Sequence, residues 1–218
     1  RVPEGAPNGD YYYTFLSETQ PPPTTEGIQS ARAKATIGSN ILITVTDSGV
    51  IDVKGKVALF DIMARYTVNL FGTQYKIFDS NDKIPFVLIV DNKGKNVIAP
   101  EGTIVIKGNF GEKAQYEIVP QNILAESQRL ITATPSGNLN CPESGKKPSY
   151  CQKPISLLIS GLFIGLYKAS TSINFGENSP NIFASTSFIA IPFKLMIGLI
   201  VVIFIGIIII KKMKDNEE

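Results

Sequence analysis

One long apolar segment near the C-terminus constrains this chain more than any other feature. The 22 residues from Ile189 to Ile210 contain a single charged side chain, that of Lys194, close to the start of the segment. As an α-helix they would extend about 33 Å at roughly 1.5 Å per residue, which matches a hydrocarbon core about 30 Å thick. A buried core helix is the alternative, but the length of this run and its lack of a polar face favour a membrane span. We therefore predict a single transmembrane helix over 189–210.

Basic residues directly after this segment predict its orientation. Lys211 and Lys212 follow it without a gap, and basic clusters beside membrane helices remain on the cytoplasmic side. We therefore expect a plasma-membrane protein whose residues 1–188 face outside and whose residues 211–218 form a cytoplasmic tail. The chain begins with Arg1 instead of Met, so either a signal peptide has been removed or the sequence is a fragment.

The two cysteines fit an external location. Cys141 and Cys151 lie in a segment rich in Gly, Pro, Ser and Asn, in which a chain readily folds back on itself. Disulfides persist in oxidising compartments, so we predict that these residues form a disulfide, with two free thiols as the alternative. Two cysteines without any His make a poor metal site. The sequence therefore predicts a closed loop and no metal.

The composition excludes several classes of function. The sequence contains no His, so Ser-His and Cys-His nucleophiles and most zinc sites cannot be built. Charged residues make up 18% of the chain and the net charge is +2, which is unlike a nucleic-acid-binding protein with a strongly basic surface. The acidic residues are scattered singly among predicted turns instead of being paired for acid–base catalysis. We predict no enzymatic activity, no cofactor and no nucleic-acid partner.

The sequence before the apolar segment is typical of an all-β protein. Short runs of Ile, Val, Phe and Tyr alternate with Gly, Pro, Asn and Asp. In one run, Ala169, Thr171 and Ile173 alternate with polar neighbours, as one face of a half-buried strand requires. The predicted strands are 11–16, 40–46, 57–60, 64–71, 75–78, 86–90, 102–107, 115–119, 129–134, 156–159, 167–175 and 182–188. The predicted fold class is all-β, with immunoglobulin-like β-sandwiches followed by one C-terminal transmembrane helix.

The number of strands indicates more than one domain. Twelve strands exceed the seven to nine of an immunoglobulin-type sandwich. Pro21, Pro22 and Pro23 place a loop between the first two strands, which cannot bury a core by themselves. We predict that residues 1–48 are the closing strands of a truncated first sandwich and that residues 49–188 form a complete one. A single larger sandwich that includes both early strands is the alternative.

Three parts of the sequence carry a family resemblance. They are NGDYYYTFL with GSNILITV (8–16 and 38–45), IPFVLIVDNKGKNVIAPEGTIVIKGNFGEK (84–113), and GLYKASTSINFG with ASTSFIAIPFKL (165–176 and 184–195). In these parts the chain resembles the bacterial cell-surface proteins related to the WxL-interacting proteins. The resemblance implies two consecutive immunoglobulin-like sandwiches and a C-terminal transmembrane helix, with peptidoglycan contacts on the first sandwich.

Two groups of residues allow both a structural and a functional interpretation. Tyr11, Tyr12 and Tyr13 either offer an aromatic binding surface or include a structural tyrosine whose hydroxyl bonds nearby backbone. Asp91 and Asn92 precede Gly94 between two apolar runs, so we expect them to shape a turn.

We weigh three functions for a protein of this kind. The first is a surface-anchored binding or structural protein whose sandwich contacts another surface protein or peptidoglycan. The second is a calcium-dependent adhesion module, for which Asp79, Ser80, Asn81 and Asp82 are the one oxygen-rich cluster, although they lack the ligand spacing of a calcium loop. The third is a wall-polymer hydrolase, which would need paired carboxylates or an activated nucleophile. We expect the first of these functions.

Overall fold

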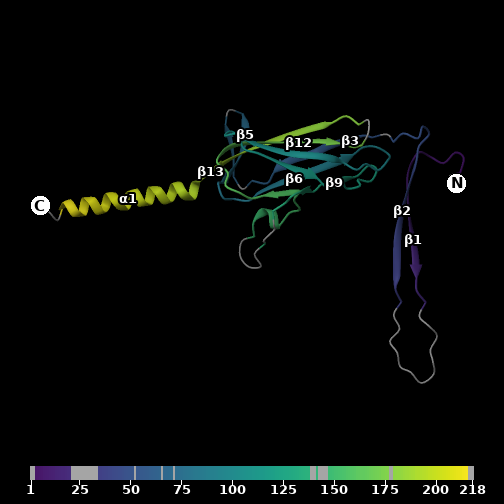
Figure 1. Ribbon diagram of the computed structural model, residues 1–218, viewed down its shortest axis with the longest axis horizontal. Helices are drawn as coiled ribbons and strands as arrows, with labels where there is room; N and C mark the ends of the chain where they lie inside the picture. Colours follow the sequence, from purple (N-terminus) through teal and green to yellow (C-terminus); the bar gives the residue numbers. More distant parts are fainter. Residues whose placement is uncertain are drawn as a thin grey trace, which may run out of the picture.

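The chain folds into β-strands and one long C-terminal helix, α1 (Phe193–Asp215), so the predicted all-β class with a terminal helix is confirmed. A computed structural model describes residues 3–20, 34–51, 53–64, 66–70, 72–137, 141, 147–176 and 179–215. The predicted loop at Pro21, Pro22 and Pro23 lies outside these residues. Figure 1 shows a β-sandwich from which α1 leaves one end, while a two-stranded hairpin projects from the opposite end.

Two sheets make up the sandwich. The larger has the strand order β10-β8-β7-β12-β13-β5-β4, and the smaller has β11-β6-β3 with β9 also paired to β6. The larger sheet contains β4 (Tyr66–Leu70), β5 (Thr73–Asp79), β7 (Glu101–Gly108), β8 (Lys113–Ile118), β10 (Ala133–Thr134), β12 (Gly165–Asn174) and β13 (Ile182–Ile191). The smaller contains β3 (Gly55–Ile62), β6 (Ile84–Asn92), β9 (Gln128–Leu130) and β11 (Leu157–Ile159). Neighbouring strands are antiparallel except β5 and β13, which run parallel.

The core lies between the two sheets and is built around aromatic rings. Phe86 of β6 stacks on Phe60 of β3 with 6.2 Å between ring centroids, and it meets the edge of Phe188 at 6.4 Å. Phe188 of β13 in turn stacks on Tyr167 of β12 at 5.0 Å. Pairs of this kind stabilise a core beyond the area that they bury. The four rings therefore tie β3 and β6 to β12 and β13.

The alternation predicted for one strand is confirmed. In β12, Ala169, Thr171 and Ile173 are buried against the smaller sheet, whereas Lys168 beside Ala169 is exposed. A strand that is buried on one face shows this period of two in its sequence. The period therefore identified both the strand and its inner face.

One predicted strand is divided in the structure. The segment 129–134 forms two short strands, of which β9 pairs with β6 in the smaller sheet and β10 pairs with β8 in the larger. The chain crosses between the sheets at Ile131, whose backbone N–H donates to the carbonyl of Leu88, while the carbonyl of Thr132 accepts from Val119. The prediction of a single strand was wrong because β-propensity does not reveal the partner of a strand.

The first two strands form a sheet of their own. β1 (Gly9–Glu18) and β2 (Thr36–Val45) pair antiparallel along their whole lengths, from Gly9 opposite Val45 to Glu18 opposite Thr36. Neither strand joins either sheet of the sandwich. Figure 1 shows this hairpin extending away from the sandwich.

The boundary between strand and helix differs from the prediction. Ile189, expected to start the membrane helix, belongs to β13, where it pairs with Leu166 of β12 and Ile77 of β5. The helix begins four residues later, at Phe193, and continues past Ile210. The prediction was wrong here because a buried strand and a membrane helix are both apolar, so hydropathy alone does not separate them.

Candidate functional site

Helix α1 is the first candidate for a functional element. Among the described residues it is the one helix that is long and apolar enough to cross a membrane, over Phe193–Met213, with a mean hydropathy of 3.0. None of its most apolar stretch is buried against the rest of the protein. Lys194 lies in its first turn, and Lys211 and Lys212 lie in its last turns. A soluble protein would cover such a surface, whereas a bilayer core would accommodate it.

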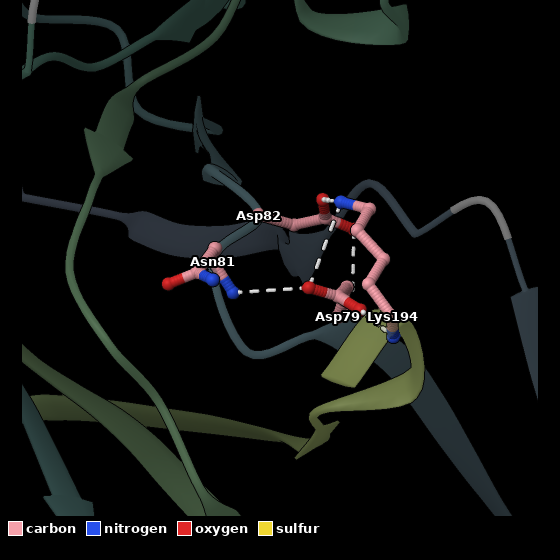
Figure 2. A network of polar contacts seen from close by, with 4 residues as sticks. All are labelled: Asp79, Asn81, Asp82 and Lys194. Carbon is pink, nitrogen blue, oxygen red and sulfur yellow. Dashed lines mark hydrogen bonds and ion pairs between the residues drawn. The ribbon is translucent and has the colours of Figure 1, made fainter. Parts of the chain in front are cut away.

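A cluster of polar side chains joins the start of α1 to the sandwich. We call Asp79, Asn81, Asp82 and Lys194 the anchor junction (Figure 2). The backbone N–H of Lys194 donates to Oδ2 of Asp79 at 3.1 Å. The ammonium group of Lys194 lies 3.6 Å from Oδ1 of Asp79 and 3.5 Å from Oδ1 of Asp82. The end of β5 therefore holds the first turn of the helix through both backbone and side-chain contacts.

Asp79 performs the role of a helix cap from a distant part of the sequence. A helix leaves its first N–H groups without partners, and a carboxylate beside them is favoured by the helix dipole. Pro192 precedes α1, and its carbonyl accepts the first helical hydrogen bond, from Met196 at 2.9 Å. Pro192 has no side-chain acceptor, so Asp79 supplies one. The N–H of Lys194, the N–H of Asn81 and the ammonium of Lys194 outweigh burial and lower the pKa of Asp79 below its ordinary value.

The turn that carries Asp79 is closed by its own hydrogen bonds. Asp82 donates its N–H to the carbonyl of Asp79 at 2.9 Å, and Asp79 donates its N–H to Oδ2 of Asp82 at 3.1 Å. The N–H of Asn81 donates to Oδ1 of Asp79 at 3.3 Å. These are the residues that the calcium hypothesis used. In the structure their carboxylate oxygens are taken up by backbone N–H groups and by Lys194.

The disulfide predicted between Cys141 and Cys151 is present, with 5.8 Å between the two Cα atoms. Cys151 ends a short 3₁₀ helix, η1 (Ser149–Cys151), which places Tyr150 beside the anchor junction. A groove of about 900 Å³ lies there, and its lining includes Tyr66, Lys83, Lys147, Tyr150, Phe193 and Lys194. The ammonium of Lys83 lies 6.0 Å from the centroid of the Tyr150 ring. The groove is therefore lined by lysine and aromatic side chains together with the carboxylates of Asp79 and Asp82, and it lies where α1 begins.

The β1–β2 hairpin is the second candidate, because one of its faces is apolar and exposed. Residues paired across a hairpin point to the same side. The register places on one side, together with Ser17 and Ser39, the apolar residues Tyr11, Tyr13, Phe15, Ile37, Ile41 and Ile43, which we call the hairpin apolar face. Five of the six have side chains that are exposed by between 39% and 67%, Tyr11 being half-buried. The opposite side is mixed, with a hydrogen bond of 2.9 Å between Thr14 and Asn40.

Asp10 fastens the base of the hairpin to the sandwich. Its carboxylate accepts hydrogen bonds from the Thr44 hydroxyl at 2.8 Å, from the Asn96 amide at 3.2 Å, and from the N–H of Val97. The Tyr12 hydroxyl also donates to this carboxylate at 3.4 Å. Burial, and to a smaller extent the negative charge of Asp10, raises the pKa of Tyr12. No local pattern in the sequence indicated this role, because a lone Asp at a strand start is typical of a solvent-facing position.

The structure bears on the structural and functional interpretations of the three tyrosines and of the turn predicted at Asp91 and Asn92. The Tyr11 hydroxyl donates to the carbonyl of Pro7 at 2.9 Å, which is the structural bond expected for one tyrosine of the three. Tyr12 and Tyr13 are about half exposed. Asn92 is buried, and its amide donates to the carbonyls of Asn96, Ile123 and Leu124, at 2.8, 3.1 and 3.0 Å.

Comparison with known proteins adds no assignment. No protein-family model matches the chain, and no curated protein sequence matches it. The interpretation of function therefore rests on the geometry of α1, the anchor junction and the hairpin apolar face.

Proposed function

We propose that this chain is a single-pass membrane protein that displays an immunoglobulin-like β-sandwich on the surface of a bacterial cell and binds another surface protein through the hairpin apolar face. The observation that carries the proposal is the placement of two exposed apolar surfaces at opposite ends of one sandwich (Figure 1). One of them, α1, has the length of a membrane span, and the other, the hairpin, is held away from it.

The hairpin apolar face supports a protein partner. A two-stranded ribbon is marginally stable in water, and an exposed apolar patch marks a contact site. Phe15 and Ile37 are 66% and 67% exposed, and both lie on the same side of the hairpin as Tyr13. A partner that lays an apolar sheet face or added strands on this side would bury them, as β-sheet partners do. Peptidoglycan, which is rich in hydroxyl and amide groups, suits such a face less well.

The proposed orientation rests on charge and on the disulfide. Lys211 and Lys212 at the end of α1 support a cytoplasmic C-terminus under the positive-inside rule. The bond between Cys141 and Cys151 suits an oxidising exterior. The sandwich and the hairpin would then lie outside the plasma membrane.

Photocrosslinking in cells tests the partner, with a matched control on the opposite face. Phe15 and Leu16 are adjacent and are exposed to the same degree, 66% and 65%, but they point to opposite sides of the hairpin. Each is replaced in turn by p-benzoylphenylalanine in the full-length membrane protein. We expect one protein adduct from position 15, little from position 16, and loss of the adduct on adding Ile41→Lys but not Leu42→Lys.

Two outcomes would contradict the proposal. Equal crosslinking from both positions would show that the hairpin apolar face does not select a partner. An adduct that disappears on muramidase digestion would show that peptidoglycan, and not a protein, lies against this face.

A further inference from the structure

The linker between the sandwich and α1 is a single residue. β13 ends at Ile191 and α1 begins at Phe193, so Pro192 alone separates them. Proline fixes its own φ and cannot act as a flexible tether. Pro192 is further held by the cap that Asp79 provides to Lys194. If α1 spans a bilayer, as the proposed function requires, this end of the sandwich must lie against the lipid headgroups.

Two further loops reach the same end of the sandwich. Ala190 of β13 pairs with Gly165, the first residue of β12, and Gly108, the last residue of β7, pairs with Tyr167. The β11–β12 loop and the β7–β8 turn therefore lie level with the last residues of β13. The two loops start within about three residues of the end of β13, which corresponds to about 10 Å at ~3.3 Å per residue. An extended side chain and the headgroup layer of about 5–7 Å together span this distance, so side chains in the loops can reach the lipid.

These two loops present large apolar side chains to the surroundings. Phe110, in the β7–β8 turn, is 76% exposed, and in the β11–β12 loop Leu162 is 68% and Ile164 is 45% exposed. Phe163 between them packs instead into the core, edge-on to Tyr167 at 5.5 Å and to Phe188 at 6.1 Å. Because Phe163 is fixed in this way, its two neighbours are directed away from the core.

Hydrogen bonds hold the two loops in this arrangement. The carboxylate of Glu112 accepts from the N–H of Phe110 at 3.0 Å and from the hydroxyl of Tyr167 at 3.3 Å. The same hydroxyl accepts the N–H of Ile164 at 3.2 Å. The Phe163 N–H donates to the carbonyl of Ser80 at 2.9 Å, next to the anchor junction. The apolar tips are therefore built into the end of the sandwich and connected to the start of α1.

Basic side chains also lie at this end of the sandwich, beside the start of α1. Lys83 and Lys147 line the groove beside the helix, together with Tyr150. The two nearby carboxylates, Asp79 and Asp82, are engaged by backbone N–H groups and by Lys194. Lysine stems can lie along apolar surface while their ammonium groups reach phosphates, and tyrosine is enriched at membrane interfaces.

We propose that the end of the sandwich that carries α1 is itself a lipid-binding surface: Phe110, Leu162 and Ile164 insert into the bilayer interface, while Lys83 and Lys147 contact anionic phospholipid headgroups. The sandwich is then seated on the membrane instead of moving freely at the end of a tether. This orientation holds the hairpin apolar face away from the bilayer. The proposal rests on the proposed function, because it requires α1 to be inserted.

The absence of Trp from the sequence provides a clean test. The full chain is reconstituted into phosphatidylcholine–phosphatidylglycerol vesicles with one Trp introduced by Phe110→Trp or Leu162→Trp. Phe183→Trp is the matched control, because Phe183 is 72% exposed but lies near the start of β13, opposite Ser172. We expect the indole at positions 110 and 162 to be quenched by lipids brominated in the acyl chain at least several-fold more than the indole at position 183. Equal quenching at the three positions would overturn the proposal.

Vesicle flotation of the same samples separates this proposal from the proposed function. A chain that fails to float with vesicles would show that α1 does not insert, which contradicts the proposed function itself. A Phe110→Trp chain that floats, but whose fluorescence is quenched no more than that of the Phe183→Trp chain, would contradict the seating of the sandwich alone.

The lysines are tested by lipid selectivity. Spin-labelled phosphatidylglycerol and phosphatidylcholine are compared for association with the reconstituted full chain. We expect Lys147→Gln to reduce the preference for phosphatidylglycerol by roughly half and Lys95→Gln, which removes an exposed lysine from the β6–β7 loop near the hairpin, to leave it unchanged. The same preference in both variants would overturn the assigned role of the groove lysines.

Discussion

The carboxylate of Asp79, at the end of β5, accepts a hydrogen bond from the backbone N–H of Lys194, in the first turn of α1. The two residues are 115 positions apart in the sequence. A strand of the sandwich thus caps the helix that we assign to the membrane, and this contact ties the first turn of α1 to the end of β5. Removing this cap should loosen the helix start without unfolding the sheets.

Asp79→Ala tests the cap. Loss of a carboxylate cap leaves helix N–H groups without a partner, so the melting temperature of the detergent-solubilised full chain should fall by a few degrees. Asp79→Asn should lower it less, because an amide oxygen can still accept the hydrogen bond. Hydrogen exchange should increase mainly in the first turn of α1. Unchanged exchange there in Asp79→Ala would show that the contact does not hold the helix.

Acid should weaken the fold through Asp79 and Asp91. The Lys194 N–H lowers the pKa of Asp79; burial would raise the pKa of Asp91, but Lys93 and Lys56, at 3.1 and 3.5 Å, lower it overall. Because both pKa values are depressed in the folded state, the stabilisation is present above the unfolded value of about 3.9 and is lost as pH falls through the folded values. Urea unfolding between about pH 7 and about pH 2.5 measures the loss. A double Asp79→Asn, Asp91→Asn variant with the same pH dependence as the wild type would contradict this account.

Asn92→Ala should be among the most damaging single changes. The Asn92 amide satisfies three carbonyls, and its Oδ1 accepts the N–H of Gly94 at 2.9 Å. Truncation leaves the Asn96 carbonyl and the Gly94 N–H without these partners, while the carbonyls of Ile123 and Leu124 keep hydrogen bonds from Ile98 and Ser127, and it should cost about 2–4 kcal/mol in the free energy of unfolding. Asn109→Ala, in the exposed β7–β8 turn, is the control and should change it by less than about 0.5 kcal/mol. Similar values for the two variants in urea unfolding would refute the structural role of Asn92.

Reduction of the disulfide should loosen the loop that it closes and leave the two sheets intact. Cys141 and Cys151 lie outside both sheets, and the closed loop contributes Tyr150 to the groove beside α1. A loop of this size stabilises by about 2–3 kcal/mol. After reduction we expect increased hydrogen exchange over residues 147–152 and little change in β6 or β12. Two alkylatable thiols in the non-reduced protein isolated from cells would contradict the bond itself.

Those parts of the fold that depend on local pattern could be predicted from the sequence. The alternation of Ala169, Thr171 and Ile173 predicted the strand β12 and its buried face, because burial on one side imposes a period of two. The apolar segment predicted the helix but not its start, since Ile189 in a buried strand is as apolar as Ile197 in α1. Contacts between distant positions left no local trace, and the contacts that Asp10 and Asp79 make were therefore missed.

Protease accessibility in intact cells tests the central claim, that α1 anchors the chain with the sandwich outside. Protease added to cells that carry the full chain with a C-terminal tag should remove the sandwich and leave a small tagged fragment that contains α1. The fragment should resist extraction with alkaline carbonate and become digestible only after the cells are opened. Full protection of the sandwich in intact cells, or release of the uncleaved chain by carbonate, would contradict the account.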